Sequence, residues 1–280
     1  MLTAAGSILA VAGVAALTLA ANGKGPSSAP TATASTLTPR RAATSATAPT
    51  PTATALAGPT RSLPSNARLF VRGLAETTEA SISALRNFVA GPVMVNYVRD
   101  QALQTEAAAV AGQQGHPGSV TRLPNGFKIC WGAGQGCQSF TDFSSDSSGH
   151  ITDLAVDGQL ISGRLAVGTD STSSGLVLSS VYSYLSTYDH RVYVTFKVRN
   201  IGSRTLGTVN PAFLPVLVTP DGTQFSADIA HSLLPNPVLP GESVVVSAAF
   251  DTQTITGRFS LRGNGQGNGQ ALVTSEIHKL

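Results

Sequence analysis

Apolar residues follow three different spacings along the chain. Residues 2–21 form an almost unbroken uncharged apolar run, about as long as a membrane-spanning helix. Between residues 67 and 111, apolar residues recur at every third or fourth position, which predicts helices over residues 70–89 and 93–111. From residue 119 onward apolar and polar residues alternate, which predicts β-strands. A short helical part therefore precedes a long β-rich part.

The alternating part predicts two groups of strands separated by turn residues. The first group covers residues 119–123, 126–131, 137–145, 149–156 and 159–167. The second group covers residues 176–184, 191–199, 213–218, 243–250, 257–261 and 270–277. Within the strand over residues 137–145, Phe140 and Phe143 have opposite parity, so either a bulge re-aims one of them or both faces of the sheet are covered. Regular turns between the later strands are typical of a β-sandwich.

The stretch from residue 127 to residue 140 predicts a β-hairpin clamped by a disulfide. With a turn at Ala133-Gly134, Cys130 lies opposite Cys137 and Phe127 lies opposite Phe140. Paired positions on neighbouring strands are close enough for a disulfide. The alternative, half of a metal site, lacks a second Cys/His pair. A disulfide needs an oxidising compartment, so we expect the chain outside the cytoplasm.

Composition and charge narrow the function classes. Charged residues make up 12% of the 280 residues, and the formal net charge is +3. Lys24, Arg40, Arg41 and Arg61 all lie in the N-terminal part, so the remainder of the chain is near neutral. The sequence has no basic stripe with interleaved aromatic residues, which argues against a nucleic-acid partner.

Residues 1–21 are expected to form a transmembrane anchor or a cleaved signal peptide. No Lys or Arg precedes the apolar run and Lys24 follows it, which on charge alone favours the opposite orientation. The predicted disulfide outweighs this bias. Residues 22–66 are rich in Ala, Thr, Pro and Ser, and we expect them to form a disordered stalk. Two folded domains, over residues 67–168 and 175–280, are expected to follow.

The first expected domain carries a family resemblance. Its helices precede antiparallel strands that end in the pattern F-x-x-D-x-x-G-x-I-x-x-L-x-V-x-G, from Phe143 to Gly158. Over about residues 67–167 this arrangement resembles the nuclear-transport-factor-2-like (cystatin-like) domains of exported actinobacterial, Mce-associated proteins. The resemblance implies an α+β cone, in which helices pack into the concave face of a curved antiparallel sheet and often leave a pocket. We interpret Tyr97, Phe127, Trp131 and Phe140 as candidates for the lining of such a pocket.

The second expected domain resembles another family. The segments V-Y-V-T-F-K-V-R-N-I-G, L-V-T-P-D-G-T-Q-F and L-P-G-E-S-V-V-V-S-A-A-F-D begin at Val192, Leu217 and Leu239. Over about residues 175–278 they resemble the telokin-like, immunoglobulin-like domains of secreted Gram-positive proteins. The resemblance implies an all-β immunoglobulin-like sandwich that serves attachment or interaction and has no known chemistry.

The first resemblance also brings a catalytic alternative. Its superfamily includes ketosteroid-isomerase-like and cyclase-like enzymes, which use an Asp base and a donor such as Tyr in an apolar pocket. The candidates for these roles are Asp142, Asp153 and Asp157, with Tyr97. Asp142 flanks a predicted hairpin and Asp157 precedes a glycine, and both are typical turn positions. We therefore expect no catalytic residue.

Metal and cofactor chemistry is not expected either. The histidines stand singly, without a histidine partner two or four residues away. They are His116, His150, His190, His231 and His278. The sequence contains no G-x-S-x-G nucleophile motif and no phosphate-binding P-loop motif.

The expected function is that of a non-enzymatic binding or scaffolding protein of the bacterial cell envelope. It is expected to lie outside the cytoplasm, anchored by its N-terminal helix, or secreted if that segment is cleaved. Its partner is expected to be an unidentified envelope protein, glycan or apolar ligand. The alternatives are an isomerase-like or cyclase-like enzyme and a purely structural surface protein. A buried carboxylate facing a tyrosine across a cavity favours the enzyme.

Overall fold

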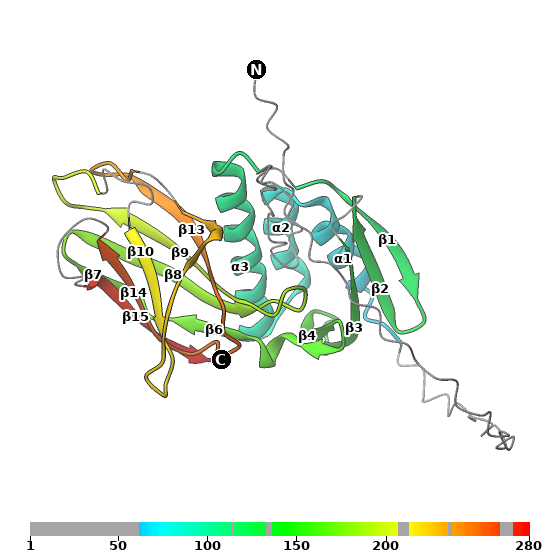
Figure 1. The fold of residues 1–280 in the computed structure, drawn as a ribbon. Helices are drawn as coiled ribbons and strands as arrows, with labels where there is room; N and C mark the ends of the chain where they lie inside the picture. Colours follow the sequence, from blue (N-terminus) through cyan, green and yellow to red (C-terminus); the bar gives the residue numbers. More distant parts are fainter. Residues whose placement is uncertain (1–61, 114, 133–135, 207–212, 235–236, 264–270) are drawn as a thin grey trace, which may run out of the picture. The chain divides into compact units, whose positions relative to one another are not determined.

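The computed structural model describes residues 62–113, 115–132, 136–206, 213–234, 237–263 and 271–280. The expected N-terminal helix, nearly all of the expected stalk and the turn at Ala133-Gly134 lie outside these residues. Within the described part, no helix is both long enough and apolar enough to cross a membrane. The described part belongs to one compact unit, which contains mostly antiparallel β-strands and a few helices (Figure 1).

Four helices precede the first described strand. They are α1 (Ala67–Glu76), α2 (Glu79–Ala84), the 3₁₀ helix η1 (Leu85–Phe88) and α3 (Gly91–Val110). The expectation of one helix over residues 70–89 is wrong, because Thr77 adopts a left-handed conformation with φ 54° and ends α1. Thr78 then starts α2, and its side chain accepts a hydrogen bond from the Ser81 amide. The second expected helix is confirmed.

The first sheet has five antiparallel strands in sequence order. They are β1 (Gly118–Leu123), β2 (Gly126–Trp131), β3 (Cys137–Ser145), β4 (Ile151–Val156) and β5 (Gln159–Leu160). The expected hairpin register is confirmed, since Cys130 pairs with Cys137 and Phe127 pairs with Phe140.

A β-bulge in β3 resolves the opposite parity of its two phenylalanines. The pairing of β3 with β4 shifts between Thr141 and Ser144, and Asp142 takes a positive φ of 51°. As a result Phe140 and Phe143 are both buried in the same core. The bulge is the first of the two explanations that the sequence left open.

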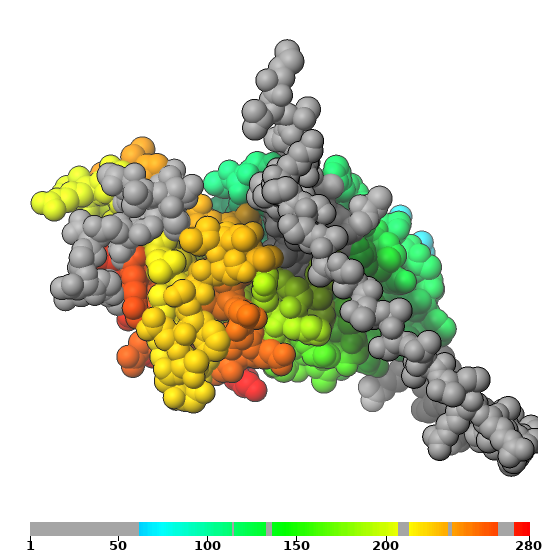
Figure 2. Space-filling view, in the orientation of Figure 1, coloured from blue at the N-terminus to red at the C-terminus, as the bar shows by residue number. Residues whose placement is uncertain are grey.

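The second sheet is a nearly closed antiparallel sheet of ten strands. Its strands are β6 (Leu165–Gly168), β7 (Ser171–Ser173), β8 (Leu176–Leu185), β9 (Val192–Asn200), β10 (Phe213–Val218), β11 (Gln224–Ser226), β12 (Asp228–Leu233), β13 (Ser243–Phe250), β14 (Gly257–Gly263) and β15 (Ala271–Lys279). Their order is β11-β10-β14-β15-β6-β8-β9-β13-β12, with β7 paired to β8. Strands near the two ends of this order contribute side chains to one hydrophobic core. For example, Phe196 of β9 and Phe259 of β14 have ring centroids 4.9 Å apart. Figure 2 shows the segment with β10 to β12, in yellow, on the surface of one face.

The strand expected over residues 159–167 is divided between the two sheets. β5 belongs to the first sheet, the 3₁₀ helix η2 (Ile161–Gly163) follows, and β6 belongs to the second. Arg164 lies at this junction and is 3% exposed. Its Nε donates to the Leu185 carbonyl at 2.7 Å, and its Nη1 donates to the side chain of Gln159. A buried arginine therefore joins the last strand of the first sheet to β8 of the second.

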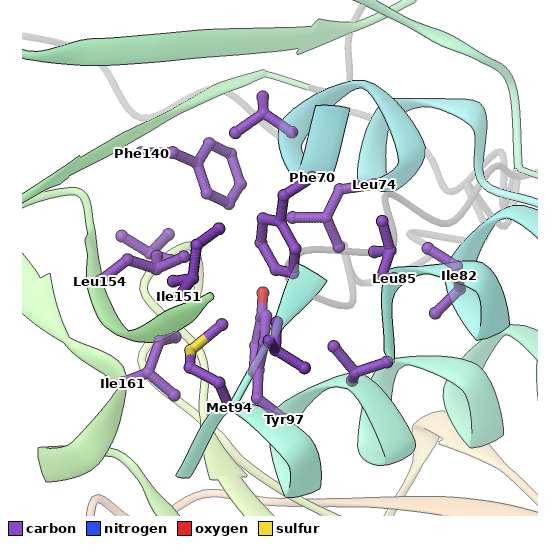
Figure 3. Packing of buried hydrophobic residues seen from close by; sticks show 14 of the residues in the cluster. Phe70, Leu74, Ile82, Leu85, Met94, Tyr97, Phe140, Ile151, Leu154 and Ile161 are labelled. Carbon is purple, nitrogen blue, oxygen red and sulfur yellow. The ribbon is translucent and has the colours of Figure 1, made fainter. Parts of the chain in front are cut away.

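Helix α3 lies between the helices and strands of the first sheet and the strands of the second (Figure 1). Met94 and Tyr97 belong to the first core, which also holds Phe70, Phe140 and Ile151 (Figure 3). The C-terminal half of α3 packs on β8, β9, β12 and β13 instead. That smaller core holds Leu103, Ala107, Ala108, Tyr182, Tyr193, Leu233, Val245 and Ala249. The two sheets thus share one helix.

Gly126 offers a test of the packing between β2 and β3. A Cβ atom at this position would lie 2.0 Å from the Phe140 carbonyl oxygen, so a side chain requires the two strands to move apart. We predict that Gly126→Ala lowers the free energy of unfolding by about 1–3 kcal/mol, as overpacking does. Urea unfolding followed by the fluorescence of Trp131, the chain's single tryptophan, measures this loss.

Gly163→Ala is the matched control, because no atom lies within 4 Å of its added Cβ. It should leave the unfolding midpoint almost unchanged. Equal midpoints for the two variants would contradict the close approach of β2 and β3.

Candidate functional site

The disulfide hairpin is a structural part of the first sheet. Cys130 and Cys137 form a disulfide, with their Cα atoms 4.1 Å apart. Trp131 follows on the buried face and is 2% exposed. Gly118 of the neighbouring strand lies against it, since an added Cβ there would come within 3.0 Å of the Trp131 ring. The two cysteines and the tryptophan therefore serve cross-linking and packing.

The four aromatic candidates for a pocket lining lie in the first core. Tyr97, Phe127, Trp131 and Phe140 are each at most 5% exposed. Phe127 also lines a groove at the surface, described below. Figure 3 shows the Tyr97 hydroxyl pointing into the apolar core toward Phe70. Among the described residues this hydroxyl has no hydrogen-bond partner.

The largest of the described pockets is a groove between α1 and β1, with a volume of about 710 Å³. A pocket of this size can hold a small organic ligand. We call it the arginine groove. It is lined by Leu63, Pro64, Arg68, Arg72, Ala75, Glu76, Pro117, Gly118, Val120, Arg122 and Phe127.

Secondary structure explains the positions of the arginines. Arg68 and Arg72 are four residues apart on α1, so they lie on one face of the helix. Arg122 reaches the groove from β1, whose alternate residues share one face. Its guanidinium lies 4.8 Å from the centroid of the Phe127 ring, and Nη1 donates to the Gly126 carbonyl at 3.2 Å. The sequence alone does not reveal this cluster, because the chain after the stalk is near neutral and about forty residues separate α1 from β1.

A second polar feature is buried where α3 meets the strands of the second sheet. Asp100 is fully buried, and its Oδ2 accepts a hydrogen bond from Gln104 Nε2 at 2.8 Å and a longer one from Gln101 Nε2 at 3.4 Å. Its Oδ1 has no hydrogen-bond partner among the described residues. Thr195 of β9 also lies close enough to affect its protonation.

Burial dominates the electrostatics at this place. It raises the pKa of Asp100 from 3.8 to about 7, although the hydrogen bonds from Gln104 and Gln101 and the nearby Thr195 hydroxyl act in the opposite direction. Burial also raises the pKa of Tyr97 well above its usual value, and the nearby Tyr184 and Asp100 raise it further. Near neutral pH a large fraction of Asp100 is therefore uncharged.

The carboxylates proposed for an enzyme lie elsewhere. Asp142 and Asp157 are exposed, and the Asp157 carboxylate accepts hydrogen bonds from the amide and hydroxyl of Ser139. Asp153 is half-buried and accepts from the Leu154 amide. The carboxylate near Tyr97 is that of Asp100, which was not among the expected candidates.

A signal for Asp100 was present in the sequence. The expected helix over residues 93–111 holds Arg99, Asp100 and Glu106 as its charged residues and carries no long polar face. Such a helix is normally buried on several sides, and then a charged residue can be buried with it. None of the described pockets is lined by Asp100 or Tyr97.

The histidines within the described residues do not gather into a metal site. His150 Nδ1 lies 3.3 Å from Asp146, and His231 Nδ1 lies 2.6 Å from Asp228. Across the described part of the chain, no group of three or more His, Cys, Asp or Glu residues could hold a metal ion.

Asp100 predicts a pH dependence of stability. The unfolded chain releases this proton near pH 3.8 and the folded chain near pH 7, so the contribution of Asp100 to stability falls as the pH rises between these values. Since each pKa unit corresponds to about 1.4 kcal/mol, the full loss is at most about 4 kcal/mol. We predict that Asp100→Asn is more stable than the native chain at pH 8 and nearly equal to it at pH 4. Thermal unfolding from pH 4 to pH 8 measures the difference.

Asp142→Asn is the control for this comparison, because Asp142 is exposed and its left-handed backbone also suits asparagine. Its stability should follow that of the native chain at every pH. A constant difference between Asp100→Asn and the native chain across the whole range would contradict the raised pKa.

Comparison with known proteins shows little similarity. No protein-family model matches the chain, and no curated protein matches it. A crystal structure of a conserved hypothetical protein from Bacillus anthracis is similar to part of it, with 14% sequence identity and a TM-score of 0.25. The similarity covers 39% of this chain and 97% of the other.

Proposed function

We propose that this protein is a non-enzymatic binding or scaffolding protein that acts outside the cytoplasm, at the bacterial cell envelope. The observation that carries the proposal is the disulfide between Cys130 and Cys137. Cytoplasmic thiols are kept reduced, whereas exported proteins keep their disulfides. Residues 1–21 then act as the membrane anchor, or as a signal peptide in a secreted form. Residues 22–66 act as the stalk.

We further propose that the two sheets correspond to the two families that the sequence resembles. The helices and the bulged five-stranded sheet agree with a cone of the nuclear-transport-factor-2-like type. The ten-stranded sheet agrees with an immunoglobulin-like module of the telokin-like type, because strands near both ends of its order pack their side chains into one core. Envelope proteins use such modules for attachment and binding, and this supports the proposed role.

Binding is favoured over catalysis by the surroundings of the buried carboxylate. An isomerase-like site needs its Asp base and its donor to face a substrate pocket. Asp100 is instead hydrogen-bonded to its own helix through Gln104, and the Tyr97 hydroxyl points into an apolar core. Binding is also favoured over a purely structural role, because the arginine groove brings an excess of positive charge together with apolar surface.

Thiol labelling of intact cells tests the compartment. We predict that a membrane-impermeant maleimide labels the protein only after an impermeant reductant has opened the disulfide, since Cys130 and Cys137 are the chain's two cysteines and both are bonded. The label is measured by the mass of the purified protein.

A Cys130→Ser/Cys137→Ser variant is the control for labelling at other side chains and should stay unlabelled. A single-cysteine cytoplasmic protein reports whether the cells are intact. Cysteines that react without reductant, and only after lysis, would show a reduced cytoplasmic protein and overturn the proposal.

A further inference from the structure

We propose that the arginine groove binds an amphiphilic oxyanion, that is, one carboxylate or phosphate head attached to an apolar body. The inference rests on the proposed function as a binding protein and names the class of ligand. The groove lies between α1 and β1 and combines three arginines with an apolar lining.

The charges of the groove select an anion. Arg68, Arg72 and Arg122 carry three positive charges, and Glu76 carries the one negative charge of the lining, which leaves an excess of two. Within the described part of the chain, none of these arginines lies within 4.0 Å of a carboxylate. Guanidinium groups bind carboxylates and phosphates through two parallel hydrogen bonds, which makes these oxyanions the best partners.

Two contacts within the protein restrain the Arg122 side chain before a ligand binds. Its guanidinium lies over the Phe127 ring, and its Nη1 donates a hydrogen bond to the Gly126 carbonyl. These contacts fix the direction of the side chain, so less conformational entropy is lost when an anion binds. Arg68 and Arg72 are exposed on the opposite wall and have space to move toward a ligand.

The apolar part of the lining selects the body of the ligand. Leu63, Val120 and Phe127 contribute carbon surface to the lining. An inorganic anion would leave this surface exposed to water, whereas an attached alkyl or aromatic body would cover it at a gain of about 25 cal/mol per Å². The volume of about 710 Å³ leaves room for both parts of the ligand.

Photo-crosslinking of the full-length chain tests the proposal with a site-resolved readout. The chain is placed in phosphatidylcholine nanodiscs, and the probe is dodecanoate with a diazirine on its alkyl chain. We predict that the crosslinks map to residues 63–76 and 117–127. We also predict that Arg72→Gln lowers this labelling about tenfold, which corresponds to one lost charge-assisted hydrogen bond of about 1.4 kcal/mol.

Two variants and a neutral probe serve as controls. Arg72 has no hydrogen-bond partner among the described residues, so Arg72→Gln should fold normally, whereas Arg122→Gln also loses the contacts to Phe127 and Gly126. Arg86→Gln changes an exposed arginine outside the groove and should not alter the labelling. The methyl ester of the probe lacks the oxyanion and should label the groove at least tenfold less.

Competition identifies the required parts of the ligand. Displacement of the probe by unlabelled dodecanoate or by dodecyl phosphate supports the proposal, and displacement by neither overturns it. Equal competition by inorganic phosphate shows that the apolar body is not needed and also overturns it. Equal labelling by the methyl ester, or labelling confined to other residues, rejects the arginine groove as an oxyanion site. None of these outcomes changes the thiol-labelling result, so the two proposals fail separately.

Discussion

The burial of α3 on nearly every side is the constraint on which both sheets depend. Residues 97–108 of this helix are buried except at Arg99 and Glu106, so the helix has no continuous polar face. Its first half completes the core beneath the five-stranded sheet, and its second half covers strands of the ten-stranded sheet. Removing the helix would therefore expose apolar surface on both sheets at once.

This burial has an electrostatic cost that falls on a few residues. Asp100 and Arg164 both lie at the junction between the two sheets, and each is almost completely removed from water. Each is partly satisfied by hydrogen bonds, Asp100 from Gln104 and Arg164 to the Leu185 carbonyl. Buried polar groups of this kind add little net stability. However, a packing in which they lose their hydrogen-bond partners has a much higher free energy. They therefore favour one particular packing of the sheets around α3.

Local patterns in the sequence predicted most of the helices and strands. They did not predict features that depend on tertiary contacts. The alternation of Phe127, Ile129 and Trp131 and the spacing of the two cysteines were sufficient for the hairpin register. The left-handed Thr77, which divides the first expected helix, carries no comparable signal, because threonine rarely adopts that conformation. Strands β7, β11 and β12 were missed, since β7 and β11 are very short and β12 does not alternate regularly between buried and exposed positions.

The candidate sites were harder to predict than the fold. Phe127 was chosen for a pocket and does line the groove, but the arginines beside it come from two elements that the sequence does not show to be neighbours. Asp100 lies three residues after Tyr97, but the expected candidates were other aspartates, two of them at turn positions where this residue type is common. Spatial convergence of distant residues was the information that local patterns lacked.

The position of β15 has a consequence for the order of assembly. This C-terminal strand lies inside the second sheet, between β14 and β6, and Ile277 pairs with both Gly257 and Gly168. While the chain emerges from the ribosome or from a translocation channel, β6 and β14 each keep one unpaired edge until residues 271–279 are free. Because exposed strand edges promote association with other chains, the second sheet is protected only once β15 has paired with both β6 and β14. Strand β15 thus joins the two parts of the second sheet, and a truncation before Ala271 would leave β6 and β14 without their shared neighbour.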